Sequence, residues 1–183
     1  MSSLASYIAL IAFGGAAGHP ATTSQPARIP EFQGEYRFLS NFWPAEVRFE
    51  GLIYPSSEHA YQAAKSLDPA ERKRIAALPT PSAAKKAGAA LKLRPNWDTE
   101  KFNVMETVVR DKFTRHADLR VKLLATGDAE LIEGNTWGDR TWGVFEGKGE
   151  NRLGKILMKI RAELRAASAT KPATSAPASQ DAG

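Results

Sequence analysis

The sequence predicts a single compact α+β domain, rich in helices, around a small and mainly antiparallel sheet. Two observations favour this class. Helix start signals and helical spacing of apolar residues recur through most of the chain, whereas strand-like runs are short and few. The length of 183 residues suits one domain of ordinary size, and no internal repeat is visible. We therefore expect one folded domain over residues 30–166.

The two ends differ in composition from the middle. Residues 1–29 carry one charge, Arg28, and an apolar run from Leu4 to Phe13 that is too short to span a bilayer. We expect a disordered N-terminal extension; a signal peptide is the alternative, although no basic residues precede the run. Residues 167–183 are rich in Ala, Ser, Thr and Pro and cannot bury enough apolar area to offset chain entropy, so we expect a disordered tail.

Short strands are expected early in the domain and once near its end. Tyr36 to Phe42 is the first, and residues 47–54 form a hairpin with Glu50-Gly51 as its turn. Glu130 to Glu133 is the last expected strand.

The first three expected helices have start signals: Ser56 or Ser57 as a cap, and then Asp or Thr followed by Pro. The helix near Asp98 also carries Phe102, Met105, Val109 and Phe113 at spacings of three to four, which predicts one buried face. The expected helices run from Ser56 or Ser57 to about Ser66, from Asp68-Pro69, from Thr80-Pro81, from about Asp98, from Asp118 to Thr126 and from about Asn151.

Composition narrows the possible chemistry. The chain has no Cys, which excludes disulfides, thiolate metal sites and cysteine nucleophiles, and favours a cytoplasmic location. Its three histidines, His19, His59 and His116, lack metal-ligand spacing, so we expect no metal site. A net charge of +5 favours phosphate-bearing ligands only modestly, and an ordinary solvated surface is the alternative.

Glu58 lies in the first turn of the helix that follows Pro55. Helical geometry places four polar side chains on one face: Glu58, Tyr61, Gln62 and Lys65. The positive end of the helix dipole favours an ionised Glu58 near neutral pH unless burial opposes it. Such a carboxylate can stabilise positive charge, activate water or attack carbon. The alternative is an ordinary first-turn Glu at a solvated helix end.

Residues 134–143 combine two Trp, one carboxylate and three Gly without helical or strand periodicity, which suits a site better than a core. Asp139 lies between Trp137 and Trp142. Enclosure by the rings would raise its pKa, whereas pairing with Arg140 would keep it charged. The alternative is an Asx-turn residue that hydrogen-bonds its own loop.

Two further segments have both a structural and a functional interpretation. Trp97 precedes the long helix and either packs against Phe102 or stacks on a planar leaving group. Residues 147–155 are basic and glycine-rich, and they open the last helix. Their backbone N–H groups, with Lys148 and Arg152, could bind phosphate; a flexible loop with a helix cap is the alternative.

Five strings of the sequence form a pattern of fixed order and spacing. They are Phe38-Leu39-Ser40-Asn41-Phe42, the segment from Tyr54 to Lys65 (Tyr-Pro-Ser-Ser-Glu-His-Ala-Tyr-Gln-Ala-Ala-Lys), Asn96-Trp97, Trp137-Gly138-Asp139 and Gly149-Glu150-Asn151-Arg152-Leu153-Gly154. Across about residues 31–166, this pattern resembles the NADAR family, also called YbiA-like N-glycosidases.

The resemblance implies a helix-rich α+β fold and hydrolysis of the bond between a phosphorylated ribose and a nitrogen. Members either remove ADP-ribose from guanine in nucleic acid, which we expect here, or cleave phosphoribosyl-amino-pyrimidine intermediates of riboflavin synthesis. The implied catalytic residues are Glu58, Asp139 and Trp97. The implied substrate-binding residues are Asn41, Phe42, Ser57, Tyr61, Lys65, Trp137, Gly138, Asn151 and Arg152.

In this interpretation Glu58 stabilises the sugar cation and orients water, Asp139 acts as acid or base or holds the ribose, and Trp97 stacks on the leaving base. Lys65 is a rival catalyst, because its amine could form a Schiff base with an opened sugar. We expect no cofactor, a phosphorylated riboside as ligand, transient contact with nucleic acid and no membrane association. The functional alternatives are a module that binds ADP-ribose or NAD without cleaving it, and a general nucleic-acid binder.

Overall fold

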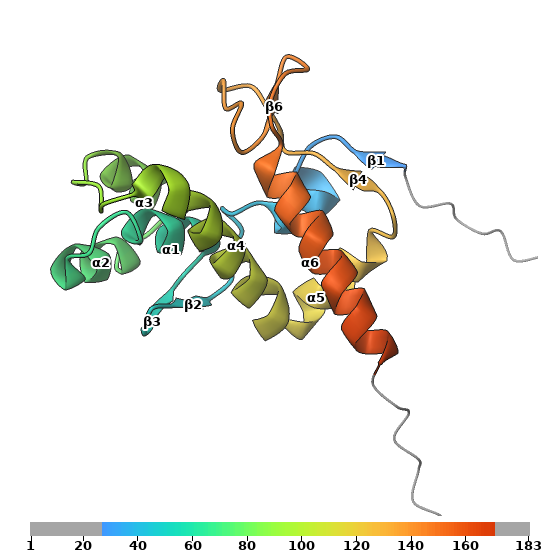
Figure 1. Cartoon of the computed structure of the whole chain (residues 1–183), viewed down its shortest axis with the longest axis horizontal. Coiled ribbons are helices and arrows are strands. Elements are labelled where there is room, and N and C mark those ends of the chain that lie inside the picture. Colours follow the sequence, from blue (N-terminus) through green and yellow to red (C-terminus); the bar gives the residue numbers. More distant parts are fainter. Residues whose placement is uncertain (1–26, 171–183) are drawn as a thin grey trace, which may run out of the picture.

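The computed structural model describes residues 27–170 (Figure 1), so most of the predicted N-terminal extension and of the predicted tail lies outside the described residues. The helices are η1 (Gly34–Leu39, a 3-10 helix), α1 (Ser57–Ala63), α2 (Pro69–Ala76), α3 (Pro81–Ala89), α4 (Trp97–Arg115), α5 (Ala117–Ala125) and α6 (Arg152–Ala169). The strands are β1 (Arg28–Ile29), β2 (Val47–Phe49), β3 (Leu52–Tyr54), β4 (Glu130–Leu131), β5 (Gly134–Asn135) and β6 (Val144–Phe145).

The predicted helices are confirmed, and the start signals of α1, α2 and α3 act as caps. Ser56, Asp68 and Thr80 each precede a helix, and each side-chain oxygen accepts a hydrogen bond from a backbone N–H of the first turn. At the other end of the domain, α6 continues to Ala169 and so includes the first residues of the segment predicted to be disordered. Continued helical hydrogen bonding from the buried part of α6 accounts for this extension.

The α+β class is confirmed, but the strands do not form one mainly antiparallel sheet. They form three separate pairs, of which only β2–β3 is antiparallel. Its turn is the predicted one, with positive φ at Glu50 and Gly51. The pairs β1–β4 and β5–β6 are parallel. Parallel strands are joined by a crossover and not by a tight turn, so local turn signals do not reveal either pair.

The strand predicted at Tyr36 to Phe42 is wrong, because this segment contains most of η1. Tyr36 and Phe38 alternate as in a strand, yet the neighbouring Phe38 and Leu39 are both buried, which a strand with one buried face does not allow. Gly34 begins the 3-10 helix at a φ of +53°.

Helix α4 lies at the centre of the domain and contacts α1, α5, α6 and β2. In Figure 1, α1, α2 and α3 lie on one side of α4, while α5, α6 and the loop with β6 lie on the other. On the predicted apolar face of α4, Met105, Val109 and Phe113 are buried and Phe102 is half-buried. Within residues 27–170, no helix is both long and apolar enough to cross a membrane.

Candidate active site

A cavity of about 780 Å³ opens between α1, α3, the segment after η1 and the loop that follows β4. Its walls contain most of the predicted site residues, brought together from distant parts of the chain: Asn41, Phe42, Glu58, Tyr61, Lys65, Trp137 and Asp139. Cavities of this size commonly bind small molecules.

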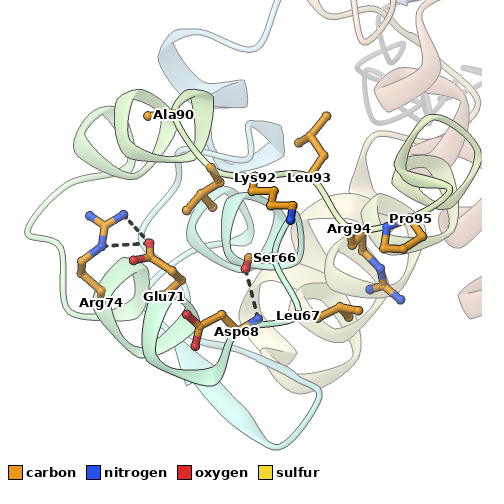
Figure 2. Close-up of a pocket in the computed structure, with 11 residues that line it drawn as sticks. Ser66, Leu67, Asp68, Glu71, Arg74, Ala90, Lys92, Leu93, Arg94 and Pro95 are labelled. Carbon is orange, nitrogen blue, oxygen red and sulfur yellow. Dashed lines mark hydrogen bonds and ion pairs between the residues drawn. The ribbon is translucent and has the colours of Figure 1, made fainter.

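A second cavity, of about 610 Å³, lies between the start of α2 and residues 90–95 (Figure 2) and contains none of the predicted site residues. Its polar groups serve local structure. Arg74 pairs with Glu71 at 2.7 Å, and the carboxylate of Asp68 caps α2. We therefore place the candidate active site in the larger cavity.

Glu58 is held at the base of the larger cavity with only 6% of its surface exposed. Its backbone N–H donates to the Asn41 carbonyl at 3.2 Å, and Gln62 Nε2 donates to its Oε1 at 2.7 Å. Burial raises the pKa of Glu58, although the Gln62 hydrogen bond and the charges of Lys85 and Lys65 act in the opposite direction. Burial therefore opposes the expected effect of the helix dipole.

Four basic side chains also line the cavity: Arg37, Lys65, Lys85 and Lys86. Lys65 was predicted, and its Nζ donates to the Gly88 carbonyl at 3.4 Å. Burial lowers the pKa of Lys65, an effect that the charge of Glu58 partly offsets. Lys85 was not predicted; its Nζ lies 5.6 Å from the centre of the Trp137 ring and 5.9 Å from that of Phe42. Lys85 is on α3, where no sequence motif set it apart from the neighbouring surface lysines.

Asp139 both lines the cavity and forms the predicted Asx-type turn. Its Oδ1 accepts hydrogen bonds from the backbone N–H groups of Thr141 and Trp142, both at 2.9 Å. The pairing with Arg140, which the sequence left open, is not found among the described residues; that guanidinium lies 3.7 Å from the carboxylate of Glu146. The turn therefore fixes the carboxylate of Asp139 at the cavity wall.

Glu133 is a third carboxylate at this cavity, and the sequence interpretation missed it. Burial raises the pKa of Glu133 to about 8, and the negative charges of Asp139 and Glu58 add to the effect. The residue is half-buried and lines the cavity. A signal was available, since this Glu ends a predicted strand directly before the glycine-rich loop. Among residues 27–170, no group of three or more His, Asp or Glu side chains is placed so that it could hold a metal ion.

Aromatic side chains form one wall in two layers. Tyr61 lines the cavity and packs between Trp97, at 5.3 Å between ring centres, and Trp142, at 5.4 Å. Trp142 also lines the cavity, although no site role was predicted for it. Trp97 is only 6% exposed and lies behind Tyr61, outside the cavity lining. Burial raises the pKa of Tyr61 above its ordinary value.

The remaining predicted site residues do not line the cavity. The amide of Asn151 bonds backbone groups: Nδ2 donates to the Leu131 carbonyl at 2.8 Å, and Oδ1 accepts from the Glu133 N–H at 3.1 Å. Arg152 bonds Glu150 at 2.6 Å. Ser57 is buried in α1, and Gly138 supplies a positive φ in its loop.

The cavity joins carboxylates, basic groups and aromatic faces on rigid elements. This combination is typical of a hydrolase that stabilises a cationic transition state on an anionic ligand. A family model of the NADAR domain matches residues 30–165. The chain belongs to the NADAR family.

Similar proteins agree with this family. The chain is 42% identical to the N-glycosidase YbiA of Shigella flexneri serotype 5b (strain 8401) over 133 residues, which cover 71% of this chain and 82% of that protein. It is 37% identical to a riboflavin biosynthesis protein of Vibrio vulnificus (strain YJ016) over 150 residues, which are 77% of this chain and 39% of that protein. The NMR structure of Escherichia coli YbiA superposes with a TM-score of 0.71 at 38% identity, covering 79% of this chain and 89% of that structure.

Proposed function

We propose that this protein hydrolyses the bond between C1 of a phosphorylated ribose and a nitrogen, and that its preferred substrate is ADP-ribose attached to guanine in nucleic acid. The chain is an N-glycosidase of the NADAR family, the activity for which its YbiA relatives are named. One observation carries the proposal for the site: Glu58 and Asp139 meet the basic side chains of Arg37, Lys65 and Lys85 in one cavity.

The two kinds of charge have separate tasks in this proposal. Cleavage of a ribose C–N bond develops positive charge on the sugar, which a nearby carboxylate stabilises. Asp139 is fixed for this task by its two backbone hydrogen bonds. Glu58, held by Gln62, orients water toward C1. The basic side chains bind the phosphates. Trp97 supports the site indirectly, through its contact with Tyr61.

Trp137 favours guanine in nucleic acid as the leaving group. Its side chain is 57% exposed and lines both the large cavity and an adjoining groove of about 380 Å³. An exposed indole can stack on a nucleobase, a contact that is worth about 1–3 kcal/mol in single-strand binders. A leaving base attached to a nucleic-acid chain would occupy this groove.

A phosphoribosyl-amino-pyrimidine is the second candidate substrate. The observation that favours it is the match to the Vibrio vulnificus protein, which is named for riboflavin biosynthesis. A binding module without turnover is the third interpretation. These three interpretations predict different outcomes when the purified chain is incubated with each riboside and the released phosphorylated ribose is quantified. A pure binder gives saturable heat in calorimetry and no product.

The same assay tests the residues. We expect Glu58→Gln and Asp139→Asn each to reduce turnover by roughly 10²–10⁴-fold, the range for loss of an acid–base group. Activity within about threefold of wild type in both variants would contradict these roles. Full activity of Lys65→Arg, with no adduct trapped by borohydride, would exclude the Schiff-base alternative.

A further inference from the structure

Glu133 differs from the other two carboxylates of the cavity in its hydrogen bonds. Glu58 accepts a hydrogen bond from Gln62, and Asp139 accepts hydrogen bonds from two backbone N–H groups, so each of these carboxylates has a donor. Within residues 27–170, the carboxylate of Glu133 has neither a hydrogen-bond donor nor an ion-pair partner at contact distance. A carboxyl group without donors lacks the hydrogen bonds that favour its charged form.

The charges around Glu133 act in the same direction. The negative groups that face it are Asp139 and Glu58, and the positive groups are Lys85 and Arg37. Burial is the largest influence on its pKa, the two carboxylates reinforce it, and the two basic groups only partly oppose it. These effects bring its pKa to about 8, so a protonated Glu133 predominates at neutral pH.

The backbone of Glu133 is fixed on both sides. Its N–H donates to Asn151 Oδ1 at 3.1 Å, and its carbonyl accepts from the Val144 N–H at 2.9 Å. Gly143 passes so close that a Cβ there would lie 2.2 Å from the Glu133 carbonyl oxygen. Two other segments thus fix the backbone that carries this side chain at the cavity, as expected for a group that must meet a substrate.

We propose that Glu133 is the general acid that protonates the leaving nitrogen, and that Asn151 is a positioning residue for it. As the C1–N bond breaks, its electron pair passes to nitrogen, which takes the proton of Glu133. Water then adds its oxygen to C1 and returns one proton to the Glu133 carboxylate. Glu58 and Asp139 face the sugar cation from the walls of the same cavity. This inference rests on the proposed N-glycosidase function.

The test compares Glu133→Gln with Glu130→Gln, a matched control on the neighbouring strand β4 whose carboxylate is exposed and pairs with Arg28. We measure kcat and KM for both ribosides between pH 5 and pH 9 as the full chain. The wild type should lose activity on the basic side of its profile as Glu133 gives up its proton near pH 8. Glu133→Gln should reduce kcat roughly 10²–10⁴-fold, with KM changed less than about threefold, and should lack this basic limb. Glu130→Gln should behave as wild type.

Two further measurements keep the test decisive. Glu133→Asp retains an acid but shortens the side chain, so it should keep a basic limb at reduced kcat. The melting temperature gives a readout apart from activity. A carboxyl group whose folded pKa is raised from 4.5 to about 8 makes wild-type stability fall as the pH rises through this window. Glu133→Gln should lack this part of the fall.

The two failures are distinguishable. One outcome would overturn the assignment of Glu133 and leave the N-glycosidase function intact. In that outcome the wild type is active, and Glu133→Gln turns over within about threefold of the wild-type rate with the same basic limb. A wild type that releases ribose from neither substrate would overturn the proposed function and this inference with it.

Discussion

Gly88→Ala offers a sharp test of how α1 and α3 shape the site. Gly88 is buried in α3 against Gln62, the side chain that holds Glu58. A Cβ at position 88 would lie 2.0 Å from Gln62 Oε1 and 2.8 Å from both its Cβ and its Cδ. Rotation of Gln62 cannot relieve the contact with its own Cβ, so the two helices must also separate.

The size of the effect follows from three contributions. Gly→Ala within a helix is intrinsically favourable by about 1 kcal/mol. Overpacking of a well-packed contact costs about 1–3 kcal/mol, and loss of a hydrogen bond to a charged group costs about 1.5–3 kcal/mol. Although helix propensity favours the variant, we therefore expect Gly88→Ala to lower the free energy of unfolding by about 2–4 kcal/mol.

The variant should also change the pH dependence of activity. The Gln62 hydrogen bond lowers the pKa of Glu58, so its loss should raise that pKa further and move the acid limb of the rate profile to higher pH. Urea unfolding and initial rates between pH 5 and pH 9 measure the two effects. Gln62→Ala should shift the same limb without the steric clash. Ala89→Gly, at an exposed position of α3, should cost at most about 1 kcal/mol and leave the limb in place. The reasoning is refuted if Gly88→Ala keeps wild-type stability and the wild-type profile.

Two other variants separate structural from functional roles. Burial lowers the pKa of Lys112 from 10.5 to about 7. Between these pH values the unfolded chain binds more protons than the folded chain, so the free energy of unfolding of the wild type should rise with pH. Lys112→Met should abolish this rise, as measured by urea unfolding at pH 6 and pH 9.5. Arg152 hydrogen-bonds Glu150 and lies over the Phe102 ring, outside the cavity lining. Arg152→Ala should therefore leave KM within about threefold of wild type. A much larger increase of KM in steady-state assays would contradict that placement.

The parts of the fold that the sequence predicted are those with a local cause. Helices capped by Ser56, Asp68 and Thr80, and the hairpin turn at Glu50-Gly51, follow from side chains and glycine acting within a few residues. The parallel strand pairs have no such local cause. The partners Arg28 and Glu130 are brought together only by the packing of the domain, so short-range patterns could not predict them.

The same distinction applies to the cavity. Glu58, Tyr61 and Lys65 share a helix face, and their common placement was predictable from spacing alone. Lys85 and Glu133 reach the same cavity from other elements. The burial and the neighbouring charges that raise the pKa of Glu133 exist only in the folded chain.

The loop over residues 134–143 is ordered by its own polar groups, which explains how a segment with two Trp side chains can form part of a site. The side chain of Asn135 donates to the Asp139 carbonyl at 2.7 Å and accepts from its N–H at 3.0 Å. The carboxylate of Asp139 in turn accepts a hydrogen bond from the backbone N–H of Trp142, whose ring packs against Tyr61. Because these bonds satisfy the backbone locally, the loop does not depend on burying Trp137, and that indole remains free for a ligand. The fixed geometry also places the carboxylate before substrate arrives, so no reorganisation is required as charge develops on the sugar.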